Sequence, residues 1–212
     1  MKAAIHQPQY LPYLGFFHKL SLADIYVVMD NTPFAKGFIN RNRIVTPDGE
    51  MWLTIPILMK SKLIKDVLIN NEIPWKDKHL KALERNYRNT HFFQEIFPGI
   101  KEIISKDWEY LSELNLELIK FVLNYLEMDV KVVLESSLSV EGMSTERLIN
   151  ICKKIDANTY ISGPGGKEYM DESLFSLSGV ELIYQDFKHP LYEQRFKQEF
   201  KQNMAVLDLL FH

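Results

Sequence analysis

The pattern of apolar and polar positions along this chain alternates between two spacings. Short apolar runs bounded by polar residues predict buried strands. They recur at residues 2–5, 25–29, 130–134, 159–161 and 180–184. Apolar residues at helical spacing separate several of these runs. Because strands that alternate with helices usually form parallel sheets, we expect an α/β fold with a largely parallel sheet and flanking helices.

Two segments depart from this alternation. The residues on either side of Pro47-Asp48-Gly49 favour strands, and a turn of this composition predicts a β-hairpin. From about residue 75 to 128 apolar residues recur at helical spacing, which predicts a helical insertion that Pro98-Gly99 interrupts. A length of 212 residues is typical of one domain, so we expect residues 1–212 to form a single one.

Composition narrows the possible classes of protein. The net charge is −3, so the chain lacks the overall positive field that non-specific nucleic-acid binding requires. Cys152 is the only cysteine, which excludes a disulfide framework and suits a reducing, cytoplasmic location. The first apolar run ends at His6, so we expect neither a signal peptide nor a membrane span. The histidines are scattered without metal-ligand spacing, so we expect no metal site, and no motif indicates a cofactor.

The first predicted strand runs into HQPQYLPYLG, an unusually polar and rigid loop. Ligands of open α/β sheets bind beyond the carboxyl ends of the strands, where this loop begins. His6 is a candidate general base, because its ordinary pKa lies near neutrality. Gln7 and Gln9 add amide donors and acceptors, and Tyr10 offers a ring that can stack on a sugar or base. The alternatives are a histidine bonded to loop carbonyls and a buried tyrosine.

Two more acid–base candidates follow predicted strands. Asp30 ends an apolar run and can deprotonate an attacking ammonium; the alternative is an ordinary cap of the next turn. Asp186 and His189 lie three residues apart in QDFKHP and form a candidate pair for proton transfer. Tyr192, which follows them, is a candidate for substrate binding.

The strongest local positive charge lies in the first third of the chain. Residues 31–65 carry six lysines and arginines against two acids. If a strand begins at Arg41, Arg41 and Arg43 point to one face and Asn42 to the other with Asn40. Two guanidinium groups on one face suit bidentate phosphate binding, with Lys36 as a further charge. The alternative is a solvated hairpin face paired with Asp48 or Glu50.

The segment SGPGGKEY is rich in glycine and follows a predicted strand. Glycines allow backbone N–H groups to approach a phosphate closely, and a lysine can neutralise its charge. The candidate contacts are Ser162, Gly163, Gly165, Gly166 and Lys167. The alternative is a Pro-Gly-Gly turn that needs no ligand.

Several blocks of the sequence resemble a known family. They are HQPQYLPYLGFFHK, NRNRI, WLTIPI, LERNY, YISGPGGKEYM, QDFKHPLYEQ and the terminal LDLLF. Together they are similar to the WbqC-like protein family over essentially the whole chain. Similar proteins look to be encoded with bacterial surface-polysaccharide and O-antigen genes. Some distant relatives resemble phage enzymes that attach an amino acid to a pyrophosphorylated base in DNA.

The resemblance implies a transferase that attaches an amine-bearing group, such as an amino acid, to a phosphorylated or nucleotide-activated sugar. In such an enzyme His6, Asp30 or His189 would accept a proton from the amine. The basic residues described above would bind the phosphates of this small-molecule substrate.

Two alternatives stay open beside the transferase. One is a non-catalytic module that binds a nucleotide sugar or a glycan through the same anion site. The other is an amino acid transferase that acts on a modified DNA base. The negative net charge argues against extensive contact with duplex DNA.

Overall fold

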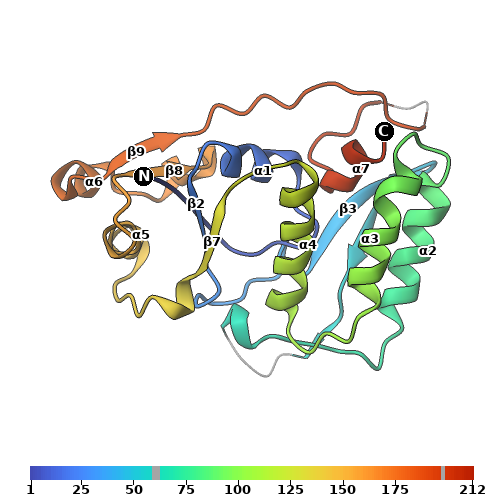
Figure 1. Ribbon diagram of the computed structural model, residues 1–212, viewed down its shortest axis with the longest axis horizontal. Coiled ribbons are helices and arrows are strands. Elements are labelled where there is room, and N and C mark those ends of the chain that lie inside the picture. Colours follow the sequence, from blue (N-terminus) through green and yellow to red (C-terminus); the bar gives the residue numbers. More distant parts are fainter. Residues whose placement is uncertain (59–62, 197–198) are drawn as a thin grey trace. The chain divides into compact units, whose positions relative to one another are not determined.

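The computed structural model describes residues 1–58, 63–196 and 199–212 (Figure 1). The chain forms two compact units. The sheet unit comprises residues 1–7, 15–31 and 126–188, and the helical unit comprises residues 8–14, 32–125 and 189–212. Each unit has its own core, so each is described by itself.

The sheet unit is built on five parallel strands. They are β1 (Lys2–His6), β2 (Ile25–Val28), β7 (Lys131–Leu134), β8 (Thr159–Ser162) and β9 (Glu181–Tyr184). Their order in the sheet is β7-β2-β1-β8-β9, and every neighbouring pair is parallel. Counted along the chain, this is the order 3-2-1-4-5 of doubly wound α/β proteins. The predicted α/β fold is therefore confirmed.

Helices cover both faces of this sheet. Alternate residues of β1 and β2, such as Ala3 and Ile25, pack in one core with α5 (Ser144–Lys154) and α6 (Glu172–Ser178). The residues between them face α1 (Leu14–Ser21), and the ring centroids of Phe16 and Tyr26 are 5.7 Å apart. His6 belongs to this second set, because side chains alternate along a strand. Short 3₁₀ turns follow β7 (η2, Glu135–Ser137) and β8 (η3, Pro164–Glu168).

The helical unit begins with the predicted hairpin. Strands β3 (Arg41–Thr46) and β4 (Gly49–Thr54) pair antiparallel, from Arg41 opposite Thr54 to Thr46 opposite Gly49. A second, shorter antiparallel pair follows, and the 3₁₀ turn η1 precedes its second strand. Its elements are β5 (Ile57–Leu58), η1 (Ile64–Asp66) and β6 (Leu68–Ile69).

Three helices form the body of the unit and lie side by side in Figure 1. They are α2 (Trp75–Tyr87), α3 (Phe93–Ser105) and α4 (Leu111–Tyr125). The predicted interruption at Pro98-Gly99 is wrong, since α3 continues through both residues. Pro98 has no N–H to donate, but α3 stays helical because its apolar face is buried. A Cβ on Gly99 would lie 2.3 Å from the Phe121 ring, so this glycine permits α3 to approach α4 closely.

The C-terminal segment completes the helical unit with α7 (Val206–Leu210). It lies along the hairpin, because the Ala205 N–H donates to the Arg43 carbonyl at 2.8 Å. Phe211 packs against Tyr87 and Phe93, with both ring centroids 5.2 Å away. Within the part of the chain that the structure describes, no helix has the length and apolar character needed to cross a membrane.

Candidate functional site

The direction in which the sheet grows reverses between β1 and β8. From β1 the chain continues to β2 on one side, whereas from β8 it continues to β9 on the other. The carboxyl ends of two such strands flank the topological switch point, which is where open α/β sheets bind their ligands. His6 is the last residue of β1, and Ser162 is the last residue of β8. The strand order thus gives His6 the position expected of a ligand-binding residue.

The surroundings of His6 fix its chemical state. Its Nδ1 lies 3.0 Å from the Gln7 carbonyl oxygen, which can only accept, so Nδ1 carries the proton. Nε2 therefore keeps a lone pair. The ring packs edge-on against Phe16, with 5.2 Å between the two ring centroids. Burial lowers the pKa of His6 to about 3, and the positive charge of Lys19 contributes to the shift. His6 is neutral at pH 7 and can accept a proton.

Lys19 is a candidate that the sequence-based analysis missed. It lies on α1 with only 3% of its surface exposed. Burial lowers the pKa of its amine to about 7. A sequence signal exists, because Lys19 follows Phe16 by three residues and therefore shares the apolar face of the helix. Lys19 and His6 together provide two basic nitrogens on one side of the sheet.

Asp30 forms hydrogen bonds with the turn after β7, which lies far from it in the sequence. The residue is 4% exposed and follows β2. Its carboxylate accepts hydrogen bonds from the Ser136 N–H at 2.9 Å and from the Ser136 hydroxyl at 2.6 Å. Asp30 thereby ties the end of β2 to the turn after β7. Its role as a base stays a prediction.

A buried ion pair lies beside Ser136. Glu135 is 1% exposed and contacts the Arg147 guanidinium of α5. Sequence analysis did not single out this pair, because an isolated acid and arginine twelve residues apart carry no pattern.

The glycine-rich segment forms the turn η3. A Cβ on Gly166 would lie 2.3 Å from the Ser162 hydroxyl oxygen, so close packing explains this glycine. Gly163 and Gly165 have open space around the corresponding position. The Lys167 ammonium lies 5.0 Å from the centre of the Tyr184 ring. Phosphate binding by this segment stays a prediction, as does a role for Asp186, which is exposed after β9.

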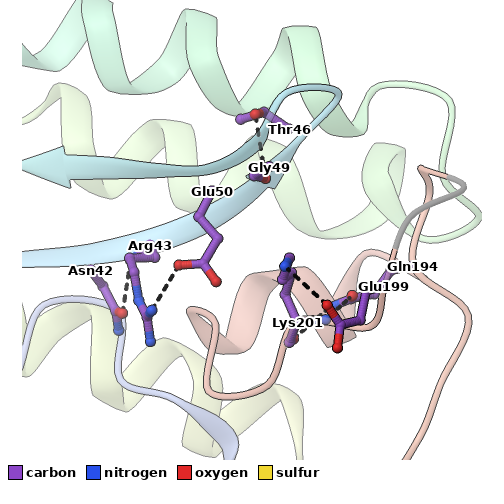
Figure 2. Close-up of polar contacts among 8 residues, drawn as sticks. All are labelled: Asn42, Arg43, Thr46, Gly49, Glu50, Gln194, Glu199 and Lys201. Carbon is purple, nitrogen blue, oxygen red and sulfur yellow. Dashed lines mark hydrogen bonds and ion pairs between the residues drawn. The ribbon is translucent and has the colours of Figure 1, made fainter.

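In the hairpin of the helical unit, asparagines and arginines alternate between the two faces as predicted. Asn42 and Asn40 are buried at 1% and 7% exposure, whereas Arg41 and Arg43 both lie over the exposed Trp52 ring. Figure 2 shows that Arg43 reaches Glu50, with 2.7 Å between nitrogen and oxygen. Arg43 therefore forms the pair with Glu50 that the alternative interpretation, a solvated hairpin face, expects. Arg41 forms no ion pair with any residue that the structure describes. Lys36 is exposed before the hairpin.

Buried amides attach the loop at residues 8–14 to the hairpin. The Asn115 amide donates to the carbonyls of Pro8 at 3.0 Å and Ile39 at 2.7 Å. The two bonds hold Pro8 and Ile39 close to each other, just before Gln9 and Asn40. The Tyr10 N–H donates to the Phe38 carbonyl at 2.9 Å. These bonds use backbone groups of the loop and fix its path beside the hairpin. Gln9 is half-buried between them.

Tyr10 is fully buried, and its hydroxyl lies 2.9 Å from Nδ1 of His79. His79 Nε2 lies 3.2 Å from the Thr54 carbonyl, so Nε2 donates and Nδ1 accepts from Tyr10. Burial lowers the pKa of His79 to about 4. Sequence analysis missed His79, although its spacing of four residues from Trp75 and from Leu83 places it on the buried face of α2.

The lowered pKa of His79 predicts how the stability of the helical unit depends on pH. The unfolded histidine has an ordinary pKa of about 6.5, so below that pH protons bind the unfolded chain preferentially. The free energy of unfolding should fall by about 2 kcal/mol between pH 7 and pH 5. Urea unfolding followed by tryptophan fluorescence measures the effect, because all three tryptophans lie in the helical unit.

A matched pair of variants isolates this contribution. His79→Gln should lose the contribution of about 2 kcal/mol that His79 makes, whereas the exposed His91→Gln should retain it. An unchanged pH dependence in His79→Gln would contradict the assignment.

A buried carboxylate organises the C-terminal part of the helical unit. Asp208 is 0% exposed and accepts hydrogen bonds from Tyr87 and Tyr192 at 2.6 Å each and from Gln194 at 2.7 Å. Gln194 also exchanges two hydrogen bonds with the backbone of Lys201 (Figure 2). Tyr192, a predicted substrate contact, is thus engaged inside the protein. Its pKa is raised by burial and by the Asp208 charge.

His189 lies near this cluster. Its Nδ1 is 2.8 Å from the Pro190 carbonyl oxygen, and its ring lies 5.6 Å from Phe200 and 6.1 Å from Tyr192. Its role in proton transfer stays a prediction. Among the residues that the structure describes, no group of three or more acidic, cysteine or histidine side chains is arranged to hold a metal ion.

Comparisons with known proteins agree with the sequence blocks identified above. A family model described as the WbqC-like protein family matches residues 7–212. An uncharacterised protein of Mycobacterium tuberculosis is 30% identical over 216 residues, a match that covers 100% of this chain and 93% of the relative. No solved structure matches the chain. The extent of the family match shows that the chain belongs to the WbqC-like protein family.

Proposed function

We propose that this protein is a transferase of bacterial surface-polysaccharide (O-antigen) biosynthesis. In this proposal it attaches an amine-bearing group, such as an amino acid, to a phosphorylated or nucleotide-activated sugar. The observation that supports the proposal is that His6 ends β1 beside the switch point of the parallel sheet, and that the charge of the buried Lys19 contributes to its lowered pKa. Basic nitrogens at a ligand-binding edge favour a substrate with negative charge.

The proposed reaction needs a base. The amine nitrogen attacks the sugar carbon that carries the phosphate oxygen, and the C–O bond breaks as the new C–N bond forms. The phosphate or nucleoside diphosphate leaves with the bonding electrons. The proton of the attacking amine passes to Nε2 of His6, which holds a free lone pair because Nδ1 is protonated.

A bound phosphate would adjust both bases. A negative charge close to His6 raises its pKa from about 3 towards the neutral range, where a general base is most effective. The same charge favours the protonated form of Lys19, which then pairs with the phosphate. His6 is preferred to Asp30 as the base, because both oxygens of Asp30 accept bonds from Ser136. The proposal includes a cytoplasmic location, which the single cysteine supports.

The proposal is tested by incubating the purified protein with a panel of nucleotide sugars and a pool of amino acids. The released nucleoside diphosphate is measured, and mass spectrometry identifies a sugar that has gained an amino acid. Release that requires both substrates would support a transferase. Binding of a nucleotide sugar without any release would instead indicate the non-catalytic binding module.

A further inference from the structure

Two large aromatic side chains lie exposed next to each other on the helical unit. Trp52 is 43% exposed on β4, and Phe38 is 41% exposed just before β3. Their ring centroids are 6.0 Å apart. Single exposed apolar residues are common, but an adjacent aromatic pair beside cationic groups is typical of a surface that binds a planar, charged ligand.

Arg41 supplies the charge of this surface. Its guanidinium carbon lies 4.4 Å from the centre of the Trp52 ring, a cation–π contact. Its Nε is buried without a hydrogen-bond partner, and no carboxylate that the structure describes pairs with the group. Arg43, on the same face, is already paired with Glu50. Arg41 therefore retains unused donors that suit a phosphate.

We propose that the outer face of the β3–β4 hairpin binds a nucleoside diphosphate. The exposed surfaces of Phe38 and Trp52 contact the base, and Arg41 binds the diphosphate. The ligand is a single nucleotide rather than a nucleic acid, because Glu50 lies on the same face and repels a longer phosphate backbone. This inference goes beyond the proposed function, because it assigns a nucleotide site to the hairpin of the helical unit by itself.

The experiment measures binding of ADP, UDP, the matching nucleosides and pyrophosphate by isothermal titration, with tryptophan emission recorded in parallel. A base in contact with Trp52 should quench its emission. Trp52→Leu should weaken nucleotide binding about 10-fold or more, which is the usual contribution of base stacking, and leave pyrophosphate binding within about 3-fold. Arg41→Gln should weaken both nucleotide and pyrophosphate binding.

Matched controls are an exposed aromatic and an exposed arginine elsewhere on the helical unit, tested as Phe92→Leu and Arg85→Gln. Both should bind as the unchanged protein does. Circular dichroism checks that the Trp52 and Arg41 variants are folded, as expected for changes on an exposed face.

Three results would overturn the inference. Nucleotides could bind no more tightly than pyrophosphate, which would leave a phosphorylated substrate possible but remove the aromatic contacts. Nucleotides could bind equally well to the Trp52→Leu and Arg41→Gln variants, which would place their site elsewhere. No ligand could bind at millimolar concentration. The transfer assay judges the proposed function separately, because it detects turnover of complete nucleotide sugars.

Discussion

Replacing His6 with glutamine should lower the turnover number by about 10²–10⁴-fold, which is the usual contribution of a general base. Glutamine keeps a polar side chain at the end of β1 but cannot accept the proton of the attacking amine. The KM for the nucleotide sugar should change by no more than about 3-fold, since the phosphate contacts are retained. Release of nucleoside diphosphate under saturating amine measures both constants.

Lys19→Met provides the matched comparison. The substitution removes the charge but preserves most of the buried volume, so it should raise KM for the phosphorylated substrate and affect turnover less. The two variants thus separate proton transfer from phosphate binding. A His6→Gln protein that is folded and retains full turnover would exclude His6 as the base.

Replacing Asp208 with alanine should destabilise the helical unit by about 3–5 kcal/mol. The change removes the acceptor for two tyrosine hydroxyls and one amide, and each buried donor left without a partner costs about 1–3 kcal/mol before the structure relaxes. Such a loss is a large part of the total stability of an ordinary domain. Urea unfolding monitored by tryptophan emission, to which the buried Trp75 of α2 contributes, reports the effect.

An exposed carboxylate serves as the control for this variant. Asp107 pairs with Lys76 at the surface, so Asp107→Asn should change the free energy of unfolding by less than about 1 kcal/mol. A similarly small effect in Asp208→Ala would show that the hydrogen bonds around Asp208 contribute little to stability.

The central strands of the sheet were predictable because they are buried on both faces. Residues 25–28 are all buried and consist only of apolar side chains, so their sequence carries the signal directly. The hairpin was equally clear from its turn residues. The predicted helix break at Pro98-Gly99 was wrong, because tertiary packing outweighs the local preference of proline and glycine to end a helix. The buried face of α3 outweighs the missing hydrogen bond, and the glycine serves the contact with Phe121.

The candidate site was predictable only in part. The alternation of Arg41 and Arg43 follows from the period of a strand, but which arginine has a partner depends on the position of Glu50 across the hairpin. Asp208 lies in the LDLLF block, yet its donors are 121, 16 and 14 residues away in the sequence. A single sequence gives no sign of partners that only the folded chain brings together.

The path of the chain between the two units affects how they can be separated and inherited. It passes from one unit to the other after residues 7, 14, 31, 125 and 188. Neither unit is a continuous stretch of sequence, so no single cut of the gene would yield either one whole. A fragment that ends before residue 189 would lack α7 and therefore Asp208. Recombination at one junction therefore cannot exchange either unit for another.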